Sequence, residues 1–310
     1  MRERKGGVKA RPMNVVIIGA GKVGLVLGRI LREEGQRIVC VVSRTSGSAR
    51  KGGRFLKCAR TSTSLESIPA GTDLVYITTP HSAVEEVAGG LARLEGLDFR
   101  RMAVCHASGM LTSSVLSPLA ERGATVFSFH PLQTFPRDFE PDRIVPRARG
   151  IYFGVDGSPA AVRKARRLAR LMGSRVVVIP PELRPLYHAA CVVASNHLTA
   201  LLAVLEEMYA FLGGVQGGFF PVFSPIVAAT LGNVERTSPV AALSGPVARG
   251  GVDTIAGHLA ILRDTMPQLI PYYAAMTQET VRLAGKKGSI TEEQRERFLR
   301  LLRDYAPPTS

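Results

Sequence analysis

A short apolar stretch followed by a glycine-rich turn is the feature that most constrains the fold of this chain. Residues 15–18 read Val-Val-Ile-Ile, and the turn after them reads Gly19-Ala20-Gly21-Lys22-Val23-Gly24. This is the pattern G-x-G-x-x-G between a predicted strand and a predicted helix. The first glycine permits a tight turn, the second lets the backbone approach a pyrophosphate, and the third lets the helix pack closely on the sheet. The start of that helix offers N–H groups and the positive end of its dipole to phosphates. The sequence therefore predicts a dinucleotide-binding turn at residues 19–24.

Strand and helix patterns alternate along the first half of the chain. Apolar runs predict further strands at residues 38–42, 74–77, 102–105, 125–129, 151–155 and 175–179, with helices between several of them. The run Ile38–Val42 is apolar throughout, as expected for a strand buried on both faces of a parallel sheet. This order is typical of an α/β fold of the Rossmann type, with a doubly wound and mainly parallel sheet.

The pattern changes after Pro180-Pro181. From Leu183 onward the sequence predicts helices and no strand, most clearly at residues 186–211, 258–263, 270–283 and 291–305. The length of 310 residues agrees with two domains. We therefore expect a basic tail at residues 1–12, a Rossmann-type domain at residues 13–180 and an all-helical domain at residues 181–310.

The composition is that of a globular protein, with 45% hydrophobic and 21% charged residues. No apolar run reaches the roughly 20 residues that a membrane span needs, and Met1–Arg11 lacks the apolar core of a secretory signal. The four cysteines are widely separated, so neither a disulfide framework nor a zinc site is expected. These features predict a cytoplasmic protein that does not contact a membrane.

The net charge of +15 raises the question of nucleic-acid binding. Much of this charge lies in the N-terminal tail and in the segment Arg163–Arg170. In that segment Val162, Ala165 and Leu168 repeat at helical spacing, so the basic residues occupy the outer face of an amphipathic helix. Aromatic residues, which a single-strand binding surface requires, are not interleaved with them. A solvated helix face is therefore favoured over a nucleic-acid contact.

The residues after the second predicted strand indicate which dinucleotide is bound. An acidic side chain at this point binds the ribose hydroxyls and favours NAD. This chain has Ser43, Arg44 and Thr45 there, and no carboxylate. Two hydroxyls and a guanidinium suit a phosphate monoester, so NADP is favoured, with a merely solvated Arg44 as the alternative. Thr79 and Pro80, after the strand at residues 74–77, complete the predicted cofactor-binding set with residues 19–24.

Histidines follow several of the predicted strands. His81, His106 and His130 come after the strands at residues 74–77, 102–105 and 125–129. Ligands of open α/β sheets bind beyond the C-terminal ends of the strands, which is where these side chains are expected. His188 opens the first long helix of the second half, and Asn196 follows eight residues later. Eight residues make a little over two helical turns, so both side chains can face one cleft.

The sequence resembles a Rossmann-like NADP oxidoreductase family whose C-terminal domain is described only as a domain of unknown function. The resemblance covers nearly the whole chain after residue 13. It rests on the glycine turn at residues 19–24, on His106-Ala107-Ser108-Gly109, on His130-Pro131-Leu132-Gln133-Thr134-Phe135, on His188 with Asn196, and on Ser244-Gly245-Pro246-Val247-Ala248-Arg249-Gly250. The architecture is similar to that of ketopantoate reductase, pyrroline-carboxylate reductase and 6-phosphogluconate or β-hydroxyacid dehydrogenases. The resemblance implies a helical domain that closes the active site and forms a homodimer.

Two segments depart from these relatives. The β-hydroxyacid dehydrogenases carry a lysine, with an asparagine four residues on, in the first long helix. This chain has His188 and Val192 at that spacing, and no lysine between residues 183 and 211. The related group also commonly reads Arg-Gly-Asp after its Gly-Pro, where this chain reads Arg249-Gly250-Gly251-Val252-Asp253. The catalytic lysine is therefore not carried over, and the role of that aspartate either is missing or falls to Asp253.

The chemistry assigned to the protein follows from its predicted cofactor. Hydride transfer belongs to the nicotinamide, so the protein must orient a carbonyl or imine and supply a proton. His188 is the first candidate donor, with Asn196 as an orienting partner, and His106 is comparably placed. Substrate binding is assigned to Ser108, His130 and Arg249, the last through a carboxylate. The alternative for the histidines is loop anchoring, and for Arg249 a solvated surface position; no metal site is expected, because no H-x-x-x-H spacing occurs.

These observations leave three functional hypotheses. The first is an NADPH-dependent reductase of a small keto or imine substrate that bears a carboxylate. The second is reduction of ketopantoate. The third is a non-catalytic NADP(H)-binding sensor or regulatory protein, which the missing lysine keeps open. Since a fold does not determine a function, the choice of substrate rests on analogy.

Overall fold

The computed structural model describes residues 11–136, 138–213 and 218–305. Contacts divide the chain into two compact units, unit 1 up to His197 and unit 2 from Leu198 onward. Each unit is described by itself.

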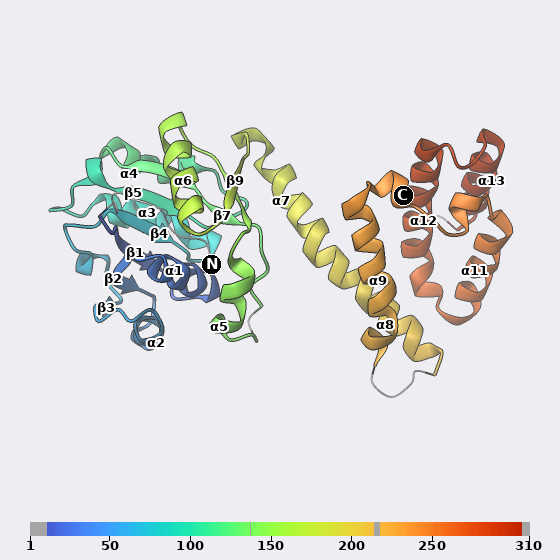
Figure 1. Cartoon of the computed structure of the whole chain (residues 1–310), viewed down its shortest axis with the longest axis horizontal. Helices are drawn as coiled ribbons and strands as arrows, with labels where there is room; N and C mark the ends of the chain where they lie inside the picture. The colour runs from blue at the N-terminus through green and yellow to red at the C-terminus, as the bar shows by residue number, and fades with distance from the viewer. Residues whose placement is uncertain (1–10, 137, 214–217, 306–310) are drawn as a thin grey trace, which may run out of the picture. The chain divides into compact units, whose positions relative to one another are not determined.

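Unit 1 is built on a six-stranded parallel sheet with the strand order β3-β2-β1-β4-β5-β6 (Figure 1). The strands are β1 (Asn14–Ile18), β2 (Arg37–Val42), β3 (Thr61–Ser62), β4 (Leu74–Ile77), β5 (Ala103–His106) and β6 (Thr125–Ser128). The reversal of strand order beside β1 is the topological switch point where ligands of doubly wound sheets bind. The predicted fold class is confirmed.

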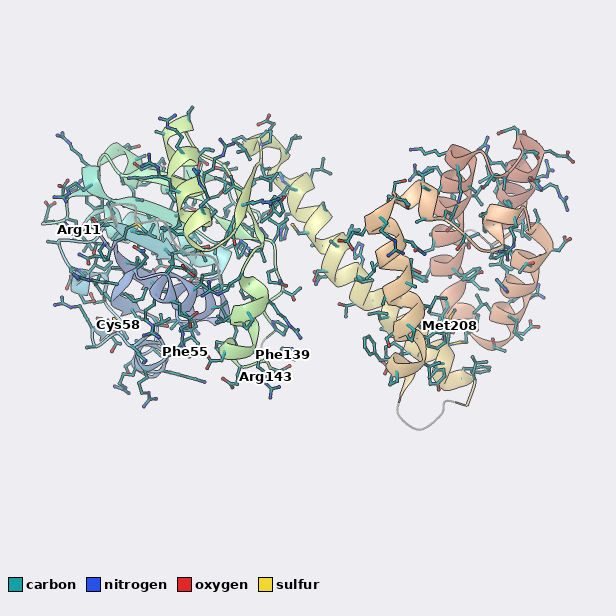
Figure 2. The ribbon with its side chains drawn as sticks, viewed as in Figure 1. Arg11, Phe55, Cys58, Phe139, Arg143 and Met208 are labelled. Atoms are coloured by element: carbon teal, nitrogen blue, oxygen red, sulfur yellow. The ribbon has the colours of Figure 1, made fainter. Side chains whose placement is uncertain are left out.

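Helices cover both faces of this sheet (Figure 1). Alternate strand residues belong to different cores: Ile17 packs with α1 (Lys22–Glu33) and α6 (Pro159–Leu171), whereas Ile18 packs with α3 (Val84–Ala92) and α4 (Ser117–Glu121). The helix α2 (Ser46–Leu56) adds Leu56 to the first core. Phe55 of α2 (Figure 2) packs against this core, and the centre of its ring lies 5.7 Å from the Arg29 guanidinium. Burial on both faces explains why the strands read as continuous apolar runs.

The last two strands predicted for the main sheet form a separate sheet instead. Strand β8 (Tyr152–Val155) pairs in parallel with β9 (Arg175–Val178) and antiparallel with the short β7 (His130–Pro131). An isolated bridge between Phe127 and Gly157 links this part of the chain to β6. A strand has two edges, and β7 and β9 occupy those of β8, so β8 cannot also extend the main sheet. The two-residue strands β3 and β7 were too short to be predicted.

Helices follow the last strand, as predicted, but the boundary between the units lies later than residue 181. The chain forms α7 (Arg184–Val192), a π turn at Val193–His197 and α8 (Leu198–Phe211). Unit 1 includes α7 and the π turn, because buried polar contacts of Arg184 attach the start of α7 to the sheet.

The described residues of unit 2 form helices joined by short turns and loops. Besides α8 it contains α9 (Phe219–Arg236), α10 (Pro239–Ala242), α11 (Val252–Thr265), α12 (Ile270–Lys287) and α13 (Glu292–Arg303). Its core includes Leu259, Val281 and Phe298. Thr291 caps α13 in a capping box with Gln294, as expected for the predicted helix start. The helix α9 was not predicted, because glycines before it and Pro225 inside it read as helix breakers.

The stretch Pro181–Phe211 is more apolar than expected. By length and composition it could span a membrane. An 18-residue window within it has a mean hydropathy of 1.5, and no residue of that window is buried. The expectation that no segment passes this test was therefore wrong, since polar residues such as Asn196 interrupt a stretch whose average stays high. The first turn of α7, near the beginning of this stretch, is held in unit 1 by Arg184. Near the other end, Met208 (Figure 2) packs against Leu262, Met266 and Leu269 of unit 2.

Two glycines are required by close packing where β1 meets α1. Gly19 has a φ of +105°, and a Cβ there would come within 2.7 Å of the Thr78 carbonyl carbon. A Cβ on Gly24 would overlap the Gly19 carbonyl oxygen and the Thr78 hydroxyl. Around Gly21, by contrast, no atom lies within 4 Å of the position of a Cβ. Gly19 and Gly24 are thus required for close packing, whereas Gly21 leaves open space beside the turn.

We predict that Gly24→Ala lowers the free energy of unfolding by about 1–3 kcal/mol, because the methyl group forces the helix away from the turn. Gly21→Ala is the matched control and should change it by less than about 1 kcal/mol, since its Cβ meets open space. Urea denaturation of both variants measures the difference. Equal losses would contradict this account of the turn.

Candidate functional site

The turn after β1 fits a dinucleotide pyrophosphate. No side chain caps the N-terminus of α1, and its first turn holds no acidic residue. The N–H groups of this turn are therefore available to an anion, next to the open space at Gly21. At the end of the neighbouring strand β4, the Thr79 hydroxyl is buried and has no hydrogen-bond partner among the described residues. The glycine turn and the end of β4 thus lie together at one uncapped helix start.

The residues after β2 differ in whether their side chains are already bound within the protein. Thr45 is the N-cap of α2: its hydroxyl oxygen accepts from the backbone N–H of Ser48 at 3.2 Å and its proton goes to the Ser48 hydroxyl at 2.9 Å. Thr45 is thereby occupied within the protein. Arg44 is exposed and forms no ion pair with the described residues, so its guanidinium is free to bind an anion. Ser43, half-buried, lies between Arg44 and the end of the strand.

His106 is anchored on both sides of its ring. It is fully buried at the end of β5, where Nε2 donates to the Thr112 carbonyl oxygen at 3.1 Å and Nδ1 accepts from the Ser108 N–H at 3.2 Å. Burial lowers the pKa of His106 to about 4. The Ser108 hydroxyl in turn accepts from the N–H groups of Met110 and Leu111. This geometry corresponds to the loop-anchoring alternative for His106, which has no free ring nitrogen to donate a proton.

A buried ion pair that was not predicted from the sequence underlies this loop. Arg184 Nε lies 3.3 Å from Asp156 Oδ2, and both side chains are 1% exposed. The guanidinium also donates to the carbonyl oxygens of Ser108 and Leu111, each at 3.2 Å. Asp156 accepts from the Ser113 N–H at 2.6 Å and from the Ser128 hydroxyl at 2.8 Å. The pair therefore ties α7 to the loop after β5 and to the end of β6.

His130 and His188 come together at Gly109. A Cβ on Gly109 would lie 2.9 Å from Nε2 of His130 and 2.8 Å from Nδ1 of His188, so both rings approach the loop because this residue has no side chain. His188 Nδ1 is buried and has no hydrogen-bond partner among the described residues. His130 Nδ1 lies 2.7 Å from the hydroxyl of Tyr187, and burial lowers the pKa of His130 to about 4. Two of the predicted histidines thus form one cluster.

The remaining predicted residues lie elsewhere. Asn196 is exposed in the π turn. A π turn absorbs one extra residue, so Asn196 follows His188 by the equivalent of seven α-helical residues, about 20° from the same direction. Arg249 is exposed in unit 2, whereas His130 and His188 belong to unit 1. Asp253 is exposed in α11, 3.9 Å from Arg297. Among the residues that the structure describes, no group of three His, Cys, Asp or Glu side chains is arranged to hold a metal ion.

The fold and this edge of the sheet define a class: a Rossmann-like nucleotide-binding domain followed by a helical unit. The model of the Rossmann-like domain matches residues 1–131, and that of the domain of unknown function DUF2520 matches residues 151–280. The first half of the chain is therefore similar to Rossmann-like domains and the second half to DUF2520 domains, the combination that the resemblance predicted. No curated protein matches the sequence at a significant level.

Solved structures share this architecture. A protein from Bacteroides fragilis, described as a "putative NADP oxidoreductase", is 26% identical, with a TM-score of 0.65 over 89% of this chain and 98% of that one. A Thermotoga maritima protein is 20% identical, with a TM-score of 0.68 over 88% and 99%. A reductive aminase from Aspergillus terreus, solved with NADPH and ethyl-5-oxohexanoate, is 15% identical, with a TM-score of 0.57 over 95% of both chains. The last two likenesses show the fold.

We predict that stability depends on pH through His106. Its folded pKa of about 4 lies below the ordinary value of 6.5, so the unfolded chain binds more protons between these two values. The contribution of His106 to the free energy of unfolding should therefore be retained above pH 6.5 and should fall by up to about 1.4 kcal/mol per pH unit as the pH drops towards 4, in addition to a like contribution from His130. Urea denaturation across this range measures the slope. His106→Gln should reduce it and His258→Gln, at an exposed histidine of α11, should not; equal slopes in all three proteins would contradict the assignment.

Proposed function

We propose that this protein is an NADPH-dependent reductase of a small keto or imine compound that bears a carboxylate. The observation that carries the proposal is that a candidate cofactor site and a candidate catalytic cluster lie at the same edge of the sheet. The uncapped start of α1 follows β1, and the His130–His188 cluster adjoins the loop after β5, at the same edge of one parallel sheet. This edge is where doubly wound sheets bind their ligands. The Bacteroides fragilis protein, the most similar in sequence of the three described above, supports the oxidoreductase class.

The chain's own residues have distinct tasks in this proposal. The N–H groups of the first turn of α1 hold the pyrophosphate, and Ser43 and Arg44 bind the 2′-phosphate. The bound nicotinamide supplies the hydride. His188, whose Nδ1 has no partner among the described residues, supplies the proton. Arg249, an exposed residue of unit 2, stays the predicted partner of a substrate carboxylate.

A homodimer through unit 2 is part of the proposal. Neither α8 nor α9 buries a single residue within one chain, although both are apolar on average. Exposed residues on them include Leu201, Phe220, Ile226 and Leu231. Apolar helix faces of this extent are typical of surfaces that associate, and a second copy of this chain is the expected partner.

A non-catalytic NADP(H)-binding protein is the second candidate. The stretch of residues 183–211 has no lysine, and His106 and His130 are both held neutral by burial. A panel of keto acids, ketopantoate among them, and cyclic imines separates the two functions, with nicotinamide absorbance as the readout. Tight NADPH binding without oxidation across the panel would favour the sensor.

Cofactor preference tests the role of Arg44. We predict that Arg44→Ala weakens NADPH binding by about tenfold or more, because a charge-assisted contact to the 2′-phosphate is lost. NADH binding should stay the same. Calorimetric titration with both cofactors measures the ratio. Arg37→Ala, at the exposed opposite end of the same strand, is the control; a selective loss that appeared there, or no selective loss at Arg44, would refute NADP specificity.

Proton supply tests the role of His188. We predict that His188→Ala lowers kcat by about 100-fold with the panel's best substrate, since general acid catalysis contributes this much, while the NADPH dissociation constant is unchanged. His197→Ala is the control, an exposed histidine nine residues later on the same helical stretch. Steady-state kinetics together with NADPH titration give both values. Full activity in His188→Ala would overturn the assignment.

A further inference from the structure

Tyr187, which the sequence did not single out, contacts His130 directly. The Tyr187 hydroxyl oxygen lies 2.7 Å from Nδ1 of His130. The two rings meet edge to face, with centroids 5.7 Å apart and planes at 89°. His130 lies in β7 and Tyr187 in α7, so the fold joins residues 57 positions apart. The contact lies wholly within unit 1.

Gly154 makes room for this contact. It is the residue of β8 that pairs with His130 of β7, and a Cβ at this position would overlap the Tyr187 hydroxyl. The Gly154 backbone also acts to lower the pKa of Tyr187, the direction expected of an N–H that faces the phenol oxygen. With the phenol oxygen next to this backbone N–H, the hydroxyl proton is available to a neighbouring acceptor.

The surroundings keep His130 neutral. Burial lowers its pKa to about 4, and the charge of Arg184 and the neighbouring His188 and His106 act in the same direction. Arg184 remains a fixed positive charge because Asp156 is its buried partner. A neutral imidazole carries a single N–H, on Nδ1 or on Nε2, and its other nitrogen accepts.

The Tyr187 proton has two neighbours to which it can be donated, Nδ1 of His130 and the sulfur of Cys191. Burial raises the pKa of Tyr187, so the hydroxyl keeps its proton near neutrality. Sulfur is a weak acceptor, whereas the lone pair of a neutral imidazole is a strong one. We propose that Tyr187 is a positioning residue: its hydroxyl donates to Nδ1 of His130 and thereby holds the imidazole proton on Nε2.

A fixed donor then adjoins the loop after β5. The Nε2–H of His130 lies beside Gly109, next to the unpartnered Nδ1 of His188. This inference rests on the proposed function and deepens it: the His130 donor orients the carbonyl oxygen or imine nitrogen of the substrate, and His188 supplies the proton. A neutral donor of this kind does not change its charge between pH 5 and 8, so its orienting role persists across that range.

Nitrogen-15 spectra of the ligand-free protein with labelled histidines test the proposal without turnover. In the native protein His130 should show a protonated Nε2 and an unprotonated Nδ1. Tyr187→Phe should populate the opposite tautomer and raise the pKa of His130, because the phenol stabilises the neutral ring. Tyr273→Phe is a matched control: its hydroxyl lies 2.7 Å from Nδ1 of His258 in unit 2, so this variant should change the signals of His258 alone.

A native His130 with its proton on Nδ1, or unchanged His130 signals in Tyr187→Phe, would overturn the inference. Both spectra can be recorded whether or not the protein is a reductase. Failure of the proposal for Tyr187 can therefore be distinguished from failure of the proposed function. In an active enzyme, Tyr187→Phe should also lower kcat by about tenfold while the NADPH dissociation constant is unchanged, as expected when a partner that orients a working residue is removed. A kcat equal to that of Tyr273→Phe would count against the orienting role.

Discussion

The buried ion pair between Arg184 and Asp156 is the interaction on which the rest of the site depends. It lies where α7 meets the sheet, and its hydrogen bonds reach the loop after β5 and the end of β6. Breaking such a pair costs about 3–5 kcal/mol, because one charge is left buried without its partner. The same pair fixes the first turns of α7, which carry Tyr187 and His188. The positions of both residues beside the sheet edge therefore follow from a contact that contributes no chemistry itself.

Three glycines permit close packing at this edge of the sheet, because they have no side chain. Gly24 allows α1 to pack on β1, Gly109 admits two imidazole rings, and Gly154 admits a phenol. At each of these three positions, a methyl group would clash with neighbouring atoms. Close approach between backbone and polar side chains is what shields His130 from solvent, and this shielding keeps its ring neutral.

Prediction from the sequence succeeded where the signal was local and periodic. The apolar runs that became β1, β2 and β4, the glycine turn, and the helical second half all followed from spacing alone. It failed where a residue's role depends on distant partners. Nothing near Asp156 in the sequence indicates that it pairs with Arg184, and His106 reads as a site residue until both of its ring nitrogens are seen to bind backbone groups.

By itself the sequence determined the Rossmann-type fold and the glycine turn that opens it, because strand burial, helix periodicity and glycine geometry act over a few residues. It also supplied Arg44 in place of an acidic residue, on which the proposal of NADP as the cofactor rests. The tertiary structure decided which histidines are free. Burial and hydrogen bonding depend on what packs around a ring, so His106 became an anchor, His130 gained Tyr187, and His188 kept a nitrogen without a partner in the described part of the chain.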